Sequence, residues 1–312
     1  MQADNANVKQ RILVLGAGEL GLAVLRGLAG KAGEHGLRIA VLLRQSAANT
    51  ENAAKHLEIE EIRALDIAIE TADLVAASVE ELAAVMARYD TVISCVGFAA
   101  GRGTQRKLTE AVLKAGVKRY FPWQFGVDYD LIGRGSPQDL FDEQLDVRDM
   151  LRAQQHTEWV IVSTGMFTSF LFEPAFGVVD LNAGRVNALG SLNTAVTVTT
   201  PEDIGRLTAA IVVHEPRIVN QVVYTAGDTL TYAELADLVE RVTGRSIERC
   251  EWSVAQLQTE LAAMPDDPLR KYRAVFAMGR GVAWDIGHTY NAEHGLSVTS
   301  AEHWAQANLA HT

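Results

Sequence analysis

Short apolar runs alternate with amphipathic stretches through the first half of the chain. The run from Ile12 to Leu15 has no polar position, as expected of a strand buried on both faces of a parallel sheet. This alternation predicts βαβ units with right-handed crossovers, and so an α/β Rossmann fold with a doubly wound parallel sheet. The predicted strands are residues 12–15, 39–43, 67–71, 91–96, 118–122 and 159–163, and the predicted helices are 22–30, 50–64, 78–88, 104–115 and 139–154.

The alternation stops after Thr164. Residues 165–190 are rich in Phe, Gly and Asn, 195–199 and 222–225 are candidate strands, and helices are predicted from Pro201 and over 230–244. The remainder is predicted to be mostly helical, with a loop at Pro265 and Pro268. We therefore predict a nucleotide-binding lobe of residues 1–164, with 195–225 returning to its sheet. Residues 165–194 and 226–312 are predicted to form a smaller α/β substrate lobe.

Helix ends carry recognisable signals. Ser78 and Thr231 are each followed three residues later by a glutamate, which is the spacing of a capping box. Gly116 follows the helix predicted over 104–115 and can adopt the left-handed conformation that ends a helix. These signals support the predicted boundaries.

A glycine-rich turn, GAGELG, follows the first strand. Gly16 permits a tight turn, Gly18 lets the backbone approach a pyrophosphate, and Gly21 lets the next helix pack closely. The free N–H groups that open this helix would face the phosphates. The alternative is a glycine-rich turn that binds no ligand, but the position between strand and helix favours a dinucleotide.

The end of the second strand bears on which dinucleotide binds. An NAD-binding protein usually has an acidic residue there to hold the ribose 2′-OH, whereas this strand is followed by Arg44. Arg44 can pair with a 2′-phosphate, and Ser46 can donate a hydrogen bond to it. We therefore favour NADP(H) over NAD(H) and FAD. Asp73, after the third strand, could reach the adenine or could serve only as a capping or loop residue.

Composition narrows the class of protein. The 312 residues are 48% hydrophobic and 21% charged, which is ordinary for a globular protein. The net charge of -11 argues against nonspecific nucleic-acid binding, although a protein partner stays open. Of two cysteines, Cys95 lies in an apolar strand, which indicates a packed thiol. No apolar run reaches membrane-spanning length and the first ten residues are polar, so we expect no membrane association and a cytoplasmic location.

Several catalytic motifs are missing. The histidines show no metal-site spacing, and no G-x-S-x-G elbow or P-loop lysine is present. The Tyr-x-x-x-Lys pair of typical short-chain dehydrogenases is also absent from the sequence. Metal-dependent, hydrolase and kinase chemistry are therefore disfavoured.

Separated segments resemble the isoflavone reductase-like, or NmrA-like, family of atypical short-chain dehydrogenases. AVLKAGVKRYFPWQFGVD resembles the family block AGVKRFxPSEFGxD, and FDEQLDVRDML resembles its FxxKxxxR helix. The other segments that carry the resemblance are RILVLGAGELG, DTVISCVG, WVIVSTGMF, VTVTTPEDIGRLTA and, more weakly, LTYAELADLVERVTGRSIE. The resemblance implies either an NADPH-dependent reductase of phenylpropanoid-like aromatic substrates or a nonenzymatic redox sensor.

The resemblance also implies where the cofactor would lie. NADPH would contact the glycine-rich turn and Arg44, with the nicotinamide near residues 123–125 and 166–167. The residues expected to hold the cofactor are Gly16, Gly18, Glu19, Leu20, Gly21, Arg44, Ser46, Asp73, Val96, Gly97, Trp123, Gln124, Phe125, Gln144, Gly165, Met166 and Phe167. Two positions depart from the family pattern, because Gln144 replaces the catalytic lysine and Trp123 replaces a small serine.

The departure at Gln144 leaves the proton donor open. An amide can keep hydrogen bonds to the ribose but cannot deliver a proton at neutral pH. Tyr129 is the most suitable replacement, although it could instead be an ordinary aromatic anchor of its loop. Asp128, Asp142 and Glu143 are further candidates for the proton donor. Asp128 could instead simply form a turn, and the other two are better explained as solvated charges near a helix N-terminus.

Aromatic residues gather after the predicted strand ends. They could line a flat apolar pocket for an aromatic or lipophilic ligand, or could belong to the core. The set is Phe98, Trp123, Phe125, Tyr129, Phe167, Phe170, Phe172 and Phe176, of which Phe98, Trp123, Tyr129, Phe167 and Phe170 are the candidate substrate residues. Two hypotheses follow: an NADPH-dependent reductase, and an NADP(H)-binding regulator that acts through a protein partner.

Overall fold

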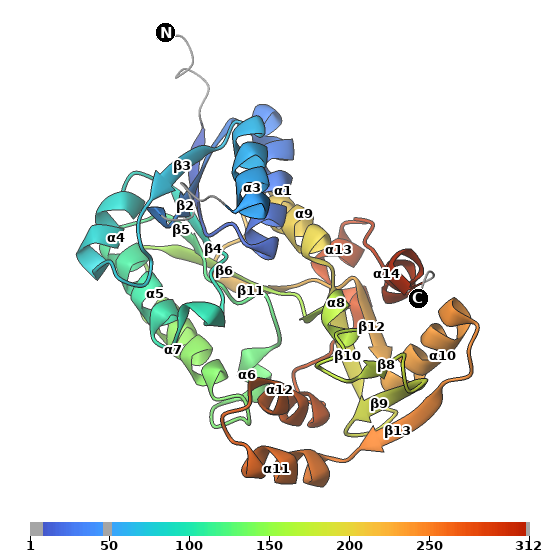
Figure 1. The fold of residues 1–312 in the computed structure, drawn as a ribbon. Coiled ribbons are helices and arrows are strands. Elements are labelled where there is room, and N and C mark those ends of the chain that lie inside the picture. Colours follow the sequence, from blue (N-terminus) through green and yellow to red (C-terminus); the bar gives the residue numbers. More distant parts are fainter. Residues whose placement is uncertain (1–8, 46–51, 310–312) are drawn as a thin grey trace. The chain divides into compact units, whose positions relative to one another are not determined.

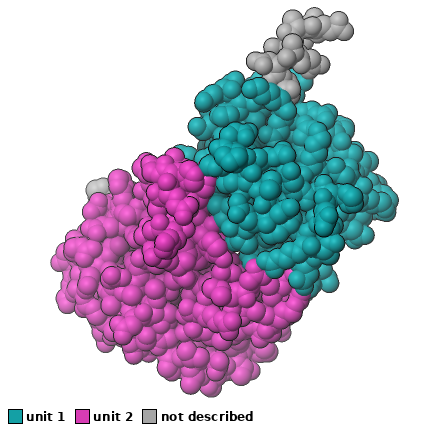
Figure 2. Space-filling model, turned by 180° about the vertical axis from the view of Figure 1, so that it is seen from behind, with its two compact units in different colours: residues 1–124, 146–162, 201–223 teal, residues 125–145, 163–200, 224–312 magenta. Residues whose placement is uncertain are grey.

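The computed structural model describes residues 9–45 and 52–309. The chain divides into two compact units (Figure 2). Unit 1 contains residues 1–124, 146–162 and 201–223, and unit 2 contains residues 125–145, 163–200 and 224–312. The start of the helix predicted over 50–64 and the candidate residue Ser46 lie outside the described residues.

Unit 1 is built on a seven-stranded sheet with the order β11-β6-β5-β4-β1-β2-β3. The pairs from β3 through β6 are parallel, which confirms the doubly wound α/β fold. Helices α1, α3 and α9 lie on one side of the sheet, and α4 and α5 lie on the other (Figure 1). The elements are β1 (Gln10–Leu15), α1 (Glu19–His35), β2 (Leu37–Leu43), α3 (Ala53–Ala64), β3 (Ala68–Thr71), α4 (Val79–Met86), β4 (Thr91–Ser94), η1 (Phe98–Ala100), α5 (Thr104–Lys114), β5 (Arg119–Phe121), α7 (Leu140–Arg152), which enters from unit 2, β6 (Glu158–Ser163), α9 (Pro201–Val212) and β11 (Gln221–Tyr224).

The central strand β1 is buried on both faces, as its apolar run predicts. Leu13 and Leu15 join a core cluster with residues of α4, α5 and α7, while the intervening Ile12 and Val14 are also fully buried. On the other side, α1 and α9 approach through glycines: a Cβ on Gly205 would lie 2.1 Å from the Ala23 carbonyl oxygen. Glycine is therefore needed to bring these two helices together.

The predicted helix signals are confirmed. Ser78 and Thr231 each form a capping box, with Glu81 and Glu234 respectively. Gly116 adopts a φ of 65° immediately after the last turn of α5. The end of α9 is held differently, since the buried Arg119 guanidinium donates to the Val212 carbonyl at 2.8 Å.

Unit 2 contains two three-stranded sheets, β12-β10-β7 and β13-β9-β8. The predicted strand 195–199 is confirmed as β10, but it pairs with β7 and β12 and does not return to the large sheet. The elements are α6 (Tyr129–Ile132), β7 (Met166–Phe167), α8 (Thr168–Leu171), β8 (Val179–Asp180), β9 (Arg185–Leu189), β10 (Ala195–Thr199), β12 (Asp228–Thr231), α10 (Tyr232–Thr243), β13 (Glu248–Trp252), α11 (Val254–Ala263), α12 (Pro268–Ala277), η2 (Ile286–His288), α13 (Tyr290–Glu293) and α14 (Ala301–Leu309).

The C-terminal part is mostly helical, as predicted, but the sequence reasoning missed one strand. Glu248–Trp252 forms β13 at the edge of a sheet. This edge strand pairs with β9, and none of its residues is buried. An edge strand of this kind needs no apolar run, so its sequence lacks the signal that marks the inner strands. Long-range pairing with β9 decides its conformation.

Within residues 9–45 and 52–309, no helix combines the length and apolar character that crossing a membrane requires. The same residues contain no group of three or more His, Cys, Asp or Glu side chains arranged to hold a metal ion.

Candidate functional site

The turn after β1 has the geometry that its three glycines predict. Gly16 has a φ of +87°, a conformation that side chains rarely adopt, and a Cβ on Gly21 would lie 2.3 Å from the Gly16 carbonyl oxygen. Around Gly18, by contrast, a Cβ would meet no heavy atom of the described chain within 4 Å, its chain neighbours aside. Gly16 and Gly21 therefore shape the turn, and Gly18 leaves space above it.

Helix α1 begins directly at this turn. Gly18 is its N-cap residue, and no side chain in the described part of the protein caps it. Its first N–H groups are thus available to an anion, and the dipole of this 17-residue helix favours negative charge there. The next two residues differ. Leu20 is buried and can offer only its backbone to a ligand. Glu19 is exposed, and the pKa of its carboxyl is raised first by desolvation and then by the charge of Glu202.

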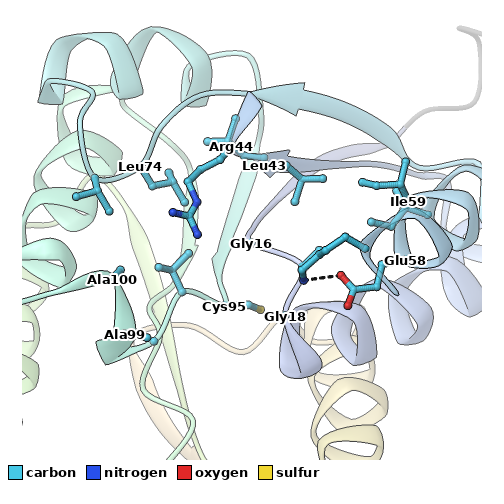
Figure 3. Close-up of a pocket in the computed structure, with 17 residues that line it drawn as sticks. Gly16, Gly18, Leu43, Arg44, Glu58, Ile59, Leu74, Cys95, Ala99 and Ala100 are labelled. Atoms are coloured by element: carbon cyan, nitrogen blue, oxygen red, sulfur yellow. Dashed lines mark hydrogen bonds and ion pairs between the residues drawn. The ribbon is translucent and has the colours of Figure 1, made fainter. Parts of the chain in front are cut away.

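A cavity of about 550 Å³ opens where β1, β2 and β4 end (Figure 3). Its walls come from the glycine-rich turn, the ends of β2 and β4, the loop after β3, and α3. The lining residues are Gly16, Ala17, Gly18, Leu42, Leu43, Arg44, Lys55, Glu58, Ile59, Ile62, Leu74, Val75, Cys95, Val96, Gly97, Ala99 and Ala100. The cavity lies at the carboxyl edge of a parallel sheet, which is where such folds bind ligands.

Arg44 lies in this cavity, as its position after β2 predicts. Figure 3 shows its side chain extending from the strand end past Leu74. Asp73 does not line the cavity. Its Oδ1 accepts hydrogen bonds from the N–H groups of Val75 at 2.9 Å and Ala76 at 3.0 Å, and these bonds lower the pKa of the carboxyl. Asp73 thus has the loop role considered for it, while its neighbours Leu74 and Val75 face the cavity.

Helix α3 contributes a wall that the sequence reasoning missed. Lys55, Glu58, Ile59 and Ile62 line the cavity, and the Lys55 ammonium lies 2.6 Å from the Glu58 carboxylate. Their spacing of three to four residues places them on one helix face, and this spacing is the signal that could have found them.

The segment after β4 is brought against Trp123. Val96 and Gly97 line the cavity, and a Cβ on Gly97 would lie 3.0 Å from the Trp123 ring. Phe98, in η1, meets the same ring edge-on at a centroid distance of 4.6 Å. Trp123 therefore fills the volume beside Gly97 that a serine would leave open. Cys95 lies in the same segment, and burial raises the pKa of its thiol, in agreement with a packed cysteine.

Gln124 is directed into the interior of unit 1. It is fully buried, and its Oε1 accepts a hydrogen bond from the Arg148 Nε at 2.7 Å. Arg148, also fully buried, lies on α7 one helical turn after Gln144. This bond makes Gln124 a support for its loop.

In unit 2, backbone contacts bring together the predicted nicotinamide segments. The Gly126 carbonyl, next to the buried Phe125, accepts hydrogen bonds from the N–H groups of Thr164 and Gly165, each at 3.0 Å. Gly165 has a φ of +72°, and a Cβ there would lie 2.1 Å from the Thr197 carbonyl oxygen. Met166 and Phe167 follow as β7, paired with β10.

Tyr129 and Gln144 both lie beside Phe141. Tyr129 is 3% exposed and meets the Phe141 ring edge-on at 5.0 Å, and its Oη lies 2.9 Å from the position of a Cβ on Gly126. Gln144 is fully buried and follows Phe141 by three residues on α7. The hydroxyl of Tyr129 is thus placed close to the backbone of Gly126.

The three acidic residues considered as proton donors are either held by hydrogen bonds or buried. Asp128 caps α6 and accepts a hydrogen bond from the Tyr224 hydroxyl at 2.6 Å. The Oδ1 of Asp142 accepts a hydrogen bond from the Gly135 N–H at 3.0 Å. The expectation that Glu143 is a solvated charge is wrong, since it is only 8% exposed on the inward face of α7.

The aromatic residues of unit 2 separate into two groups. Phe170 stacks on Phe176 at 4.5 Å and meets Tyr272 of α12 edge-on. Phe172 stacks instead on Trp304 of α14 at 4.8 Å. Phe172 and Phe176 therefore serve packing, whereas Phe170 joins α8 to α12.

Comparison with known proteins agrees with this geometry. A model of the NmrA-like family matches residues 8–280. The chain is 49% identical over 304 residues to an NmrA-like family domain-containing oxidoreductase of Gibberella moniliformis. The aligned region covers 97% of this chain and 99% of that protein.

Two solved structures share the fold. The crystal structure of isoflavone reductase has a TM-score of 0.78 at 22% identity, covering 96% of this chain and 99% of that one. The leucoanthocyanidin reductase–NADPH binary complex from Vitis vinifera has a TM-score of 0.77 at 19% identity, covering 94% and 97%. Because the family model matches most of its length, the chain belongs to the NmrA-like family, and it has the Rossmann fold seen in isoflavone reductase.

Proposed function

We propose that this protein is an NADPH-dependent oxidoreductase that reduces a small aromatic substrate by hydride transfer. The observation that carries the proposal is the cavity at the carboxyl edge of the large sheet, lined by the Gly16–Gly18 turn and by Arg44. The 49% identical oxidoreductase relative and the NADPH complex of a protein with the same fold support it.

The residues of the cavity fit NADP(H). The space above Gly18 and the uncapped start of α1 suit a pyrophosphate, and Arg44 suits a 2′-phosphate, since guanidinium groups bind phosphates through two parallel hydrogen bonds. Glu58 also lines the cavity, but its charge is paired with Lys55. The net field of these side chains therefore favours a phosphate over a bare hydroxyl.

The protein itself has to supply only part of the chemistry. When bound, NADPH supplies the hydride, and the protein must orient the nicotinamide, exclude water and provide a proton. We assign Gln144 to hydrogen bonding at the ribose and Tyr129 to proton donation. Gln144 has an amide that can donate and accept, and the Tyr129 hydroxyl lies close to Gly126, next to Phe125.

Phe98, Trp123, Tyr129, Phe167 and Phe170 are proposed to face an aromatic or lipophilic substrate. Phe98 and Trp123 already meet edge-on in unit 1, and Phe170 meets Tyr272 edge-on in unit 2. Such rings offer flat apolar surfaces for another ring. The two solved enzymes of this fold carry the names of reductases of aromatic compounds, which agrees with this choice.

A second function is favoured by one observation. Gln144 stands where the family pattern has its catalytic lysine, and it is fully buried. Without that lysine, the protein could bind NADP(H) and act as a redox sensor through a protein partner, with no turnover.

Two measurements separate these functions. Calorimetric titration with NADPH and NADH tests the cofactor, and tighter binding of NADPH is expected. Stopped-flow oxidation of bound NADPH against a panel of aromatic carbonyls and enones tests turnover. Tight NADPH binding without oxidation by any compound, together with a protein partner in a pull-down, would replace the reductase by the sensor.

A further inference from the structure

Helix α5 contacts the cavity walls without lining the cavity itself. Gln105, in its first turn, is 3% exposed and donates from Nε2 to the Val96 carbonyl at 2.7 Å. Two residues later, the Lys107 ammonium donates to the carbonyls of Val75 at 2.6 Å and Ala77 at 3.1 Å. The same helix therefore holds the loop after β3 and the segment after β4.

The loop that Lys107 holds is an apolar surface at the mouth of the cavity. Leu74 and Val75 line the cavity, and Val75 is 53% exposed in spite of its apolar side chain. Such a surface suits the flat face of a base. Within the loop, the Asp73 carboxylate accepts hydrogen bonds from the N–H groups of Val75 and Ala76, and its carbonyl accepts one from Ala77 at 2.8 Å. These bonds are internal to the loop, whereas the bonds from Lys107 tie it to α5.

We infer that Lys107 is a positioning residue for the adenine end of the cofactor, acting through the loop 73–77. The inference rests on the proposed binding of NADP(H) in this cavity. By bonding to two carbonyls of the loop, Lys107 holds Leu74 and Val75 in one arrangement before the ligand arrives. A ligand that needs this arrangement binds more weakly in proportion to the fraction of molecules that lack it.

This role differs from that of Arg44. Adenine is common to NADPH and NADH, whereas the 2′-phosphate is found only in NADPH. Loss of Lys107 should therefore weaken both cofactors by the same factor, while loss of Arg44 should change the ratio between them. The ratio separates a loss at the adenine end from a loss at the 2′-phosphate, and hydrogen exchange at the loop separates the first of these from general destabilisation of the fold.

The test compares Lys107→Met, Lys107→Arg and the matched control Lys114→Met, which lies on the same helix but pairs with Glu80 away from the cavity. Dissociation constants for NADPH and NADH are measured by calorimetry. Lys107→Met is expected to raise both by about five- to tenfold with an unchanged ratio. Lys107→Arg should recover part of the loss, because it keeps a charged donor, and Lys114→Met should behave as the wild type.

Hydrogen exchange of the ligand-free protein gives an independent readout. The N–H groups of Val75, Ala76 and Ala77 should exchange faster in Lys107→Met, because the loop opens more often. Unchanged exchange and unchanged dissociation constants would overturn the inference while leaving NADP(H) binding intact. A change confined to NADPH would also overturn it, by assigning Lys107 to the phosphate. Failure of the wild type to bind either cofactor would instead remove the proposed function, and the inference with it.

Discussion

Gly18 and Gly21 lie three residues apart in one turn, yet replacing each by alanine should have opposite consequences. A Cβ on Gly21 would lie 2.3 Å from the Gly16 carbonyl oxygen, whereas a Cβ on Gly18 would meet open space. Gly18→Ala should therefore leave the ligand-free fold nearly intact and weaken the cofactor, and Gly21→Ala should destabilise the fold itself.

The geometry sets the magnitudes. Real Cβ atoms essentially never approach other atoms within 3.0 Å, so Gly21→Ala requires α1 and the turn to separate by at least about 0.7 Å. Overpacking of this kind lowers the free energy of unfolding by about 1–3 kcal/mol. For Gly18, which has an ordinary φ of -73°, the expected loss is only about 0.5–1 kcal/mol, because alanine is the poorer N-cap. The added methyl group occupies the space proposed for the pyrophosphate, so NADPH should bind about tenfold or more weakly, about 1.4 kcal/mol.

Urea denaturation and NADPH titration of both variants measure these quantities separately. Gly18→Ala should show a near-normal midpoint with a raised dissociation constant, and Gly21→Ala should show a lowered midpoint. If Gly18→Ala binds NADPH as tightly as the wild type, the phosphates do not lie over this turn. If Gly21→Ala unfolds at the wild-type urea concentration, the close contact between turn and helix is not what stabilises the fold there.

Four further predictions concern single side chains. Arg44→Ala should weaken NADPH binding by about tenfold or more and leave NADH nearly unchanged in paired titrations, and an equal loss for both would contradict the 2′-phosphate assignment. Gln144→Lys should raise or preserve the rate of NADPH oxidation, and a large decrease would show that the buried amide is itself required. Tyr129→Phe should lower the rate with little effect on NADPH affinity, and an unchanged rate would exclude Tyr129 as proton donor. Burial would raise the pKa of Asp90, but hydrogen bonds, first from Lys118, outweigh it and lower the pKa to about 2. Asp90 therefore stabilises the fold above its ordinary pKa of 3.8 and loses this effect as the pH falls toward 2. Asp90→Asn should be less stable than the wild type at pH 6, and the difference in urea midpoint should shrink by pH 2; a constant difference would contradict this.

Local signals predicted the elements of unit 1 and part of the cavity. The apolar run at Ile12 to Leu15, the glycine spacing and Arg44 after β2 are local features, and each can be interpreted from its immediate neighbours in a strand–turn–helix context. Lys55 and Ile59 were missed because a helix face becomes a cavity wall only when the helix is packed beside the strand ends. Asp73 was left undecided for a similar reason, since its sequence position allowed both the ligand and the loop role.

The C-terminal half shows where local reasoning stops. Glu248–Trp252 has no buried apolar run, and its strand conformation depends on pairing with β9, about sixty residues earlier in the chain. Met166 and Phe167 form a strand of only two residues, held by pairing with β10. Such short elements lack a pattern long enough to be read without their partners.

The sequence by itself determined the class of fold and the geometry of the glycine-rich turn, because these depend on neighbouring residues and on backbone freedom at glycines. It also led to the proposal that Arg44 binds a 2′-phosphate, because no acidic residue follows β2. Only the tertiary structure decided which side chains meet across the chain. It buried Glu143, placed the Tyr129 hydroxyl close to Gly126, and brought Lys107 to the carbonyls of Val75 and Ala77. Burial and long-range hydrogen bonds are properties of the packed chain, and no local pattern encodes them.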